Sequence, residues 1–397
     1  MQATQATSQN SSKSSTSRII HYIKGDKPGP IIIFFGGLHG NEPAGVYALK
    51  NVLTKITAKD LRGEVYGLFG NIEALQKGKR FINEDLNRIW TTDRVDKLYE
   101  TNESNSEIRE QKALNFLISE ILSHATQPIY FIDLHTTSSK TLPFVTINDA
   151  LINRKFASRF PVPIVLGIEE YLEGPLLTYL NKLGYVSLGF ESGQHNDPNA
   201  VLNFEAFIKL VLHEAGSFID APEATIAEAT NTLKIASKYC NHVFEVIYKY
   251  HIKPDEQFIM HPGFISFEKI KKGQILASSN GEIIKSQHNA TLFMPLYQKT
   301  GNDGFFIIKK IRPFYLKLSA FLRKIKADNL LVMLPGISWY KKDEGVLRAN
   351  LKITRYLAKS IFHLFGYRNK QVSGNYVLLY NRERTTQKDL YKHLDWY

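Results

Sequence analysis

The sequence predicts an α/β fold in which a mixed, largely parallel sheet is flanked by helices and followed by a smaller C-terminal β-rich domain. Short, continuous apolar runs, typical of strands buried on both faces, alternate along the chain with segments of helical spacing. After Pro254 the pattern changes to short alternating runs separated by Gly and Asn, which indicates β-hairpins. A chain of 397 residues is long enough for two folding units, or for one with an appendage.

The predicted elements divide the chain into four parts. Residues 1–17 are almost entirely Gln, Ser, Thr, Ala and Asn, and we expect a disordered N-terminal arm. Residues 18–251 form the α/β domain, 252–311 the β-rich domain, and 312–397 a basic C-terminal extension of uncertain fold. The predicted strands of the α/β domain are 31–35, 64–69, 129–134, 162–166 and 185–190, and its predicted helices are 44–53, 107–124, 174–183, 200–215 and 224–251. In the extension we expect a basic helix over 346–365 and a short strand over 376–380.

Composition indicates a globular protein of a reducing compartment. Apolar residues make up 43% of the chain and charged residues 22%. Cys240 is the single cysteine, so neither a disulfide within the chain nor a thiolate metal site is expected. No apolar run precedes Ile19, and no apolar run approaches the roughly 20 residues that span a bilayer. We therefore expect a cytoplasmic protein without a membrane span.

The net charge of +12 is concentrated in the C-terminal extension. From residue 311 onward the chain has 17 Lys and Arg against 6 Asp and Glu, which leaves the first 310 residues nearly neutral. Such a run usually forms a solvated face, so a nucleic-acid partner is not expected. The alternative is a non-catalytic binding protein whose extension docks on an anionic surface, and a strong dependence of binding on salt would indicate it.

The most informative loop is Gly36-Gly37-Leu38-His39-Gly40-Asn41-Glu42, which directly follows the first buried strand. In open α/β sheets the ligand crevice lies beyond the carboxyl ends of the strands. Imidazole and carboxylate both suit zinc, and a bend at the glycines can turn His39 and Glu42 toward one ion. Alone, such a pair is more often a solvated polar turn.

A second predicted strand end supplies a third candidate ligand, His135, at the same edge of the sheet. Two histidines and one glutamate leave a fourth coordination position for water, as a catalytic zinc site requires. Asp133 precedes His135 by two residues and so lies on the same face of the strand. It either orients the imidazole or has a buried structural role.

The segments GGLHGNEPAG, RFINEDLNR, DLHTT and FESG, in this order, resemble the succinylglutamate desuccinylase and aspartoacylase family. Members of this family are similar to zinc carboxypeptidases in fold, and the resemblance covers about residues 30 to 310. It implies hydrolysis of the amide bond of an N-acyl amino acid or a similar small amide. It also implies one zinc ion per chain, held by His39, Glu42 and His135, and a β-rich domain that caps the site.

The resemblance assigns roles to further residues. Glu191 would be the general base that activates water, and its position at the end of a predicted strand, beside glycine, agrees with this role. Arg80 would stabilise the oxyanion, while Asn87 and Arg88 would hold the α-carboxylate of the substrate, a task for which a guanidinium is suited. Tyr297 would supply a hydroxyl to the substrate. Each role has a structural alternative: Glu191 could be a surface glutamate, and Tyr297 a half-buried strand tyrosine. The segment from Arg80 to Arg88 could be a solvated, salt-bridged face.

One departure concerns the substrate. The aspartoacylase subtype places an arginine shortly before the catalytic glutamate, whereas residues 161–190 contain no arginine and Lys182 as their single cation. This difference argues against a dicarboxylic amino acid. A carboxypeptidase-like activity on short peptides, with the terminal carboxylate bound by Arg88, is the alternative within enzymes. The sequence does not indicate the acyl group, and it is compatible with a homo-oligomer.

Overall fold

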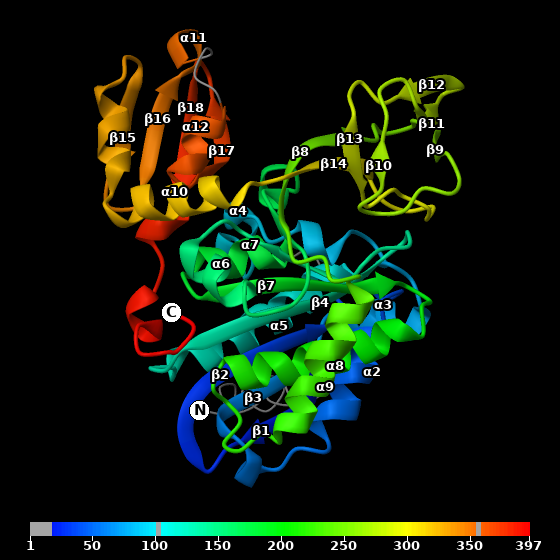
Figure 1. Cartoon of the computed structure of the whole chain (residues 1–397), viewed down its shortest axis with the longest axis vertical. Coiled ribbons are helices and arrows are strands. Elements are labelled where there is room, and N and C mark those ends of the chain that lie inside the picture. The colour runs from blue at the N-terminus through cyan, green and yellow to red at the C-terminus, as the bar shows by residue number, and fades with distance from the viewer. Residues whose placement is uncertain (1–17, 101–104, 355–358) are drawn as a thin grey trace.

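The computed structural model describes residues 18–100, 105–354 and 359–397, so the predicted arm at residues 1–17 lies outside the described residues. The α/β domain is built on a mixed sheet with the strand order β1-β3-β2-β4-β7-β5-β6-β8-β14-β13-β10 (Figure 1). Strands β3, β2, β4 and β7 at its centre run parallel, which confirms the predicted mixed, largely parallel sheet. The strands are β1 Ile19–Lys24, β2 Lys27–Gly36, β3 Arg62–Phe69, β4 Ile129–Thr137, β5 Phe144–Ile147, β6 Ile164–Leu166, β7 Val186–Gln194, β8 Val243–His251, β10 Lys269–Ile270, β13 Ala290–Phe293 and β14 Asp303–Lys310.

Helices cover both faces of this sheet because its central strands are apolar on both sides. In β2, Ile32 and Phe34 pack into one core with α2 and α8, while Ile33 and Phe35 pack into a second core with α5 and α7. The helices are α2 Ala44–Leu53, α3 Ile72–Lys77, α4 Thr92–Asp96, α5 Ser106–Ser123, α6 Leu151–Ala157, α7 Leu176–Lys182, α8 Asn199–Glu214 and α9 Glu223–Ala236, with short 3-10 turns η1 Ala58–Asp60, η2 Leu86–Arg88 and η3 Ile168–Glu170.

The helix predicted over residues 224–251 is wrong in its second half. Helix α9 ends at Ala236, and β8 (Val243–His251) then joins the main sheet beside β6 and β14. The strand sequence VFEVIYKYH is rich in β-branched and aromatic residues, and its pairing with two neighbours outweighs its helical spacing. Strand β8 therefore continues the sheet of the α/β domain into the β-rich domain.

The β-rich domain combines the edge of the main sheet with a small second sheet. Strands β14, β13 and β10 pair in antiparallel order beyond β8, while β12, β11 and β9 form a separate antiparallel sheet. The second sheet consists of β9 Phe258–Met260, β11 Ile275–Ser279 and β12 Glu282–Lys285. No helix among the described residues is long and apolar enough to cross a bilayer.

The C-terminal extension folds as a four-stranded antiparallel sheet with helices (Figure 1). The predicted strand near Tyr376 is present as β18, but the helix predicted from Val346 begins as strand β16, because the apolar Val346, Leu347 and Ala349 pack into the core of this sheet. Residues 355–358 of that predicted helix lie outside the described residues. The elements are α10 Pro313–Lys324, β15 Ile337–Lys341, β16 Val346–Asn350, α11 Leu351–Thr354, α12 Lys359–Leu364, β17 Tyr367–Ser373 and β18 Tyr376–Asn381, with 3-10 turns η4 Ala327–Met333, η5 Arg382–Arg384 and η6 Lys388–Tyr391.

The end of the chain returns to the α/β domain and completes its core (Figure 1). Tyr391 is fully buried, and its hydroxyl donates to the carbonyl of Ile129 and accepts from the amide of Val186 at 3.1 Å. Trp396 packs against Tyr130 and Phe156. The extension is thus joined to the α/β domain through aromatic packing as well as through the chain.

Candidate metal centre

The loop after β2 brings His39 and Glu42 together. Gly37 adopts a positive φ of 73°, and a Cβ on Gly40 would lie 2.0 Å from the backbone of Ala74, so this tight path excludes larger residues. The amide of Glu42 donates to the carbonyl of His39 at 3.1 Å and closes the turn. Both side chains are buried, which rules out a solvated polar turn.

The parallel pairing of β2 with β4 places His135 beside this turn. One ligand atom each of His39, Glu42 and His135 lie within 4.8 Å of one another. Nδ1 of His39 is 2.9 Å from Oε1 of Glu42, and Nδ1 of His135 is 3.1 Å from Oε2. The amide of Thr136 also donates to Oε2 at 2.9 Å. Both imidazoles therefore turn Nδ1 toward the carboxylate of Glu42.

The opposite nitrogen of each imidazole faces a further carboxylate. Nε2 of His39 lies 3.0 Å from Asp85, and Nε2 of His135 lies 2.8 Å from Asp133. Such carboxylate–histidine pairs fix the tautomer and the ring orientation of a metal ligand. Asp133 thus contacts His135, as one of its two predicted roles requires, and sequence analysis assigned no role to Asp85.

Electrostatics in the cluster favour charged carboxylates. Burial alone would raise the pKa of Glu42, but His39 and His135 hold it well below its usual range. His39 and Arg80 lower the pKa of Asp85 against the same effect of burial. Although burial opposes it, Asp133 and Glu42 raise the pKa of His135 well above its usual value. Three carboxylates around two imidazoles thus create a strongly cation-attracting centre.

Glu191 lies next to these ligands on β7, in register with His135 of β4. Strand β7 continues to Gln194, so Glu191 is within the strand and not beyond its end. Burial, together with the nearby carboxylates of Glu42 and Asp133, raises its pKa to about 8, although His135 opposes the shift. Its Oε2 is buried without a hydrogen-bond partner. This carboxyl group is therefore free to contact a ligand at the centre.

The segment from Arg80 to Arg88 forms another wall of the site. Arg80 donates to Asp85 at 2.9 and 3.1 Å, and its Nη1 lies 3.6 Å from Oε1 of Glu42. Asn87 places its amide nitrogen 3.4 Å from Nε2 of His135 and accepts from the amide of Leu176. Arg88 donates to the backbone carbonyl of Asn87 at 2.9 Å and to Asp303 of the β-rich domain at 3.0 Å.

The structure does not bring Tyr297 to the ligands. Its hydroxyl accepts from the amide of Phe264 and donates to the carbonyl of His261 within the β-rich domain. The next residue, Gln298, reaches the site, where its carbonyl oxygen accepts from His195 at 3.2 Å and from Asn41 at 3.3 Å. Tyr297 and Gln298 therefore contact different partners, although they are adjacent in the loop after β13.

His195 is a site residue that sequence analysis missed. Thr136 and Gln298 occupy its two ring nitrogens, at 2.8 and 3.2 Å. Because Gln298 accepts there, the imidazole carries its proton on Nε2 and accepts from the hydroxyl of Thr136. Burial lowers the pKa of His195, so the ring is neutral at pH 7. Its position shortly after Glu191 was the available sequence signal.

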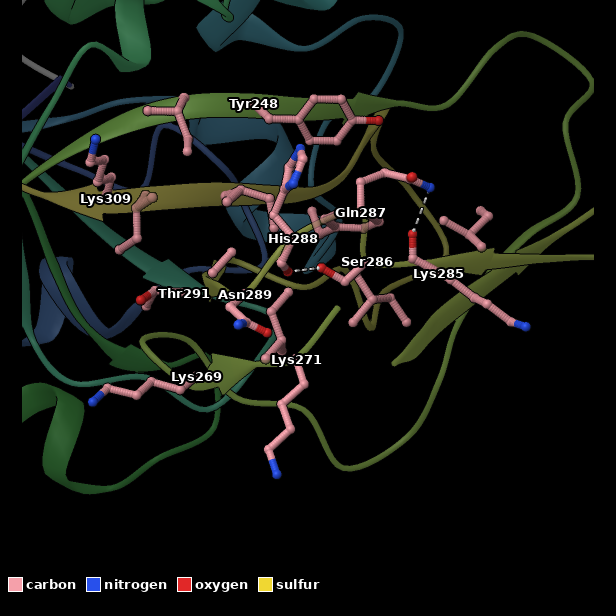
Figure 2. A pocket seen from close by; sticks show the side chains of 18 of the residues that line it. Tyr248, Lys269, Lys271, Lys285, Ser286, Gln287, His288, Asn289, Thr291 and Lys309 are labelled. Carbon is pink, nitrogen blue, oxygen red and sulfur yellow. Dashed lines mark hydrogen bonds between the residues drawn. The ribbon is translucent and has the colours of Figure 1, made fainter. Parts of the chain in front are cut away.

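A pocket of about 760 Å³ lies beside this cluster, between the α/β and β-rich domains. Arg80, Asp85 and His195 connect the two, whereas His39, Glu42, His135 and Glu191 are not among the residues that line the pocket. Its wall includes Arg80, Asp85, Arg88 and His195, together with Lys249 of β8 and Asp303 of β14. A second, larger groove of about 1210 Å³ lies within the β-rich domain, where Tyr248 of β8 and Lys309 of β14 contribute to its wall (Figure 2). None of the predicted site residues lines that groove.

The chain is similar to known proteins in both sequence and fold. Residues 28–213 match the model of the succinylglutamate desuccinylase/aspartoacylase catalytic domain. A probable aspartoacylase of Prochlorococcus marinus (strain MIT 9301) is 26% identical over 280 residues, which cover 67% of this chain and 87% of the relative. A succinylglutamate desuccinylase of Pseudomonas fluorescens (strain Pf0-1) is 41% identical over 61 residues, or 15% of this chain and 18% of the relative. The crystal structure of a succinylglutamate desuccinylase/aspartoacylase from Rhodobacter sphaeroides has the same fold, with a TM-score of 0.56 at 18% identity over 73% of this chain and 88% of that one.

Proposed function

The chain belongs to the succinylglutamate desuccinylase and aspartoacylase family through residues 28–213, and we propose that it is a zinc-dependent amidohydrolase that removes the acyl group from an N-acyl amino acid. The observation that carries this proposal is the buried cluster of His39, Glu42 and His135, whose ligand atoms lie within 4.8 Å of one another. Two imidazole nitrogens and a carboxylate are donors that zinc prefers, and three protein ligands leave one position open. The unpartnered Oε2 of Glu191 beside them also fits a catalytic site.

When bound there, zinc supplies Lewis acidity, which lowers the pKa of water and polarises the scissile carbonyl. Glu191 is expected to be ionised beside a dication, although burial raises its pKa in the bare site. Its carboxylate then takes a proton from water and delivers it to the leaving amine.

Arg80 is placed to stabilise the oxyanion that develops during attack. Its guanidinium is held by Asp85 and lies 3.6 Å from Glu42, so it points at the ligand cluster without a rearrangement. A preorganised cation in a site that excludes water contributes more than one in bulk solvent. Asn87 and Arg88 bind the carboxylate of the amino-acid portion, and they fix the distance between this group and the amide.

The proposal is tested by measuring the zinc content and the hydrolysis of N-acyl amino acids by the parent and by Glu191→Gln. We expect one zinc ion per chain in both proteins and a loss of turnover by several orders of magnitude in the variant. Glu173→Gln is the matched control, because Glu173 is exposed in the pocket wall. Equal activity of the parent and Glu191→Gln removes Glu191 from the mechanism, and hydrolysis of dipeptides in preference to N-acyl amino acids supports the carboxypeptidase-like alternative.

A further inference from the structure

The cations that line the pocket beside the candidate metal centre are all engaged by carboxylates of the protein. Among the described residues that line it, the arginine and lysine side chains are Arg80, Arg88, Arg94 and Lys249. Arg80 is paired with Asp85, and Arg94 forms two hydrogen bonds with Glu84, at 2.7 and 2.8 Å. Each guanidinium or ammonium group among these described lining residues therefore already has a carboxylate of the protein as its partner.

The β-rich domain contributes one carboxylate, Asp303, to the charge balance of this pocket. Its Oδ2 accepts from Arg88 at 3.0 Å, and its Oδ1 accepts from Lys249 at 2.9 Å. These two cations and one carboxylate carry a single net positive charge, while the carboxylate of Glu173 lines the pocket at an exposed position. Because the side chains of Asp303 and Lys249 are each 17% exposed, their charges are screened less than those of surface groups.

Apolar side chains fill much of the remaining wall. Ile168, Tyr171 and Leu172 come from η3 and the segment that follows it, while Met294, Leu296 and Phe306 come from the β-rich domain. Most of them pack against the apolar core formed around Phe144 and Phe293. This wall can bury a hydrocarbon group, but it offers no charged partner to a second carboxylate, whose desolvation would then be uncompensated.

We propose that this pocket selects N-acyl amino acids that carry one carboxylate and an otherwise uncharged, apolar body, and that Asp303 is the residue that sets this limit. The proposal rests on the proposed deacylase function and specifies its substrate class. A single carboxylate is attracted by the one surplus charge beside Arg88. A second carboxylate, on either the acyl group or the side chain, meets Asp303 or the apolar wall and is rejected.

Two matched substrate pairs test this selection in the zinc-loaded enzyme. N-acetylleucine and N-acetylaspartate differ in the amino-acid side chain, whereas N-butanoylleucine and N-succinylleucine differ in the end of the acyl group. We expect kcat/KM to favour the monocarboxylate at least tenfold in both pairs. An equal or reversed preference in the parent overturns the proposal.

Two substitutions should shift this preference in a defined direction. Asp303→Asn removes the competing charge and should reduce the discrimination about tenfold, the effect of one charge-assisted hydrogen bond. Leu172→Lys adds a cation to the apolar wall and should favour N-succinylleucine or N-acetylaspartate, even if Asp303→Asn folds poorly. Asp255→Asn, at an exposed left-handed position that Asn tolerates, is the control and should leave the ratios unchanged. Unchanged ratios in both Asp303→Asn and Leu172→Lys also overturn the proposal.

Calorimetric binding separates this inference from the proposed function. The same four compounds are titrated into zinc-loaded Glu191→Gln, which does not turn them over. Absence of hydrolysis in the parent, with the monocarboxylates still bound more tightly, overturns the deacylase function but retains the charge selection. Hydrolysis in the parent without a difference in affinity or kcat/KM between the compounds supports the deacylase function and overturns the charge selection.

Discussion

The guanidinium of Arg323 and the carboxylate of Asp149 form a 2.9 Å ion pair in which both side chains are almost completely buried, at 0% and 1% exposure. Arg323 belongs to α10 of the C-terminal extension, whereas Asp149 precedes α6 of the α/β domain. Arg154 and Arg368 contact the same carboxylate. Arg368 also reaches Glu170 at 3.4 Å, just before the pocket residue Tyr171. Some of the positive charge of the extension therefore serves an internal contact with the α/β domain.

We expect Asp149→Asn to lower the free energy of unfolding by about 3–5 kcal/mol, because it leaves buried guanidinium groups without their carboxylate. Urea denaturation followed by circular dichroism measures the change. Glu344→Gln is the control, since Glu344 and its partner Lys341 are each 56% exposed, and it should cost less than about 1 kcal/mol. A cost below about 1 kcal/mol for Asp149→Asn would show that the cluster does not stabilise the protein.

Trp396→Ala should destabilise the protein by about 3–5 kcal/mol, although the residue is next to the last in the chain. Its ring is 8% exposed and contacts Tyr130, Phe156 and Tyr391, so the substitution leaves a cavity in the core of the α/β domain. The same denaturation experiment measures this effect. Tyr340→Ala provides the comparison, because that aromatic side chain is 55% exposed. Equal costs for the two variants would contradict the packing of the tail.

Glu169 should make stability depend on pH between about 5 and 7. Burial raises its pKa to about 7, against the opposing effect of Arg368. Because the unfolded chain loses this proton near pH 4.5, the folded protein binds more protons in the interval and loses stability as the pH rises. Glu169→Gln removes the effect. Its stability relative to the parent should therefore increase from pH 5 to pH 8, by up to about 3 kcal/mol at about 1.4 kcal/mol per pKa unit. A difference that does not change with pH would refute this assignment.

Removal of the metal should lower the melting temperature of the zinc-loaded protein, and added zinc should restore it. A ligand that binds the folded state alone stabilises it by about 2.7 kcal/mol at a concentration 100 times its Kd. Calorimetry with and without a chelator measures the shift. His39→Ala should abolish the response to zinc, while His213→Ala, at an exposed position on α8, should keep it. A zinc response that persists in His39→Ala would exclude the proposed ligand set.

Arg80→Lys should retain zinc and lower kcat by about 10²–10³-fold, the usual effect of removing one oxyanion donor. A lysine keeps the charge but loses the planar fork that Asp85 holds in place. Steady-state kinetics on the best N-acyl amino acid measures this change. Arg94→Lys, at a position paired with Glu84 farther along the wall, should change kcat no more than a few-fold. Similar losses in both variants would indicate a general effect on the segment.

The grouping of His39, Glu42 and His135 could be predicted from the sequence because each of them lies at or beside the end of an apolar strand. His39 and Glu42 lie in a glycine-rich loop directly after an apolar strand, and His135 belongs to a second such strand. Neighbouring parallel strands end at the same edge of a sheet, so the order of the elements was sufficient to bring the candidates together. Arg80 and Asn87, which the resemblance indicated, also lie beside the ligands.

The tertiary structure alone decided which distant side chains complete the pocket and which charges remain available. Asp303 is 215 positions from Arg88 in the chain, and Gln298 rather than Tyr297 contacts His195. Such contacts depend on how β8 and β14 pair and on which way each residue of the loop after β13 faces, and no local pattern specifies either. The same reason accounts for the wrong second half of the helix predicted over 224–251. A stretch with mixed periodicity takes the conformation that its neighbours can hydrogen-bond and bury, and those neighbours are known only once the chain is folded.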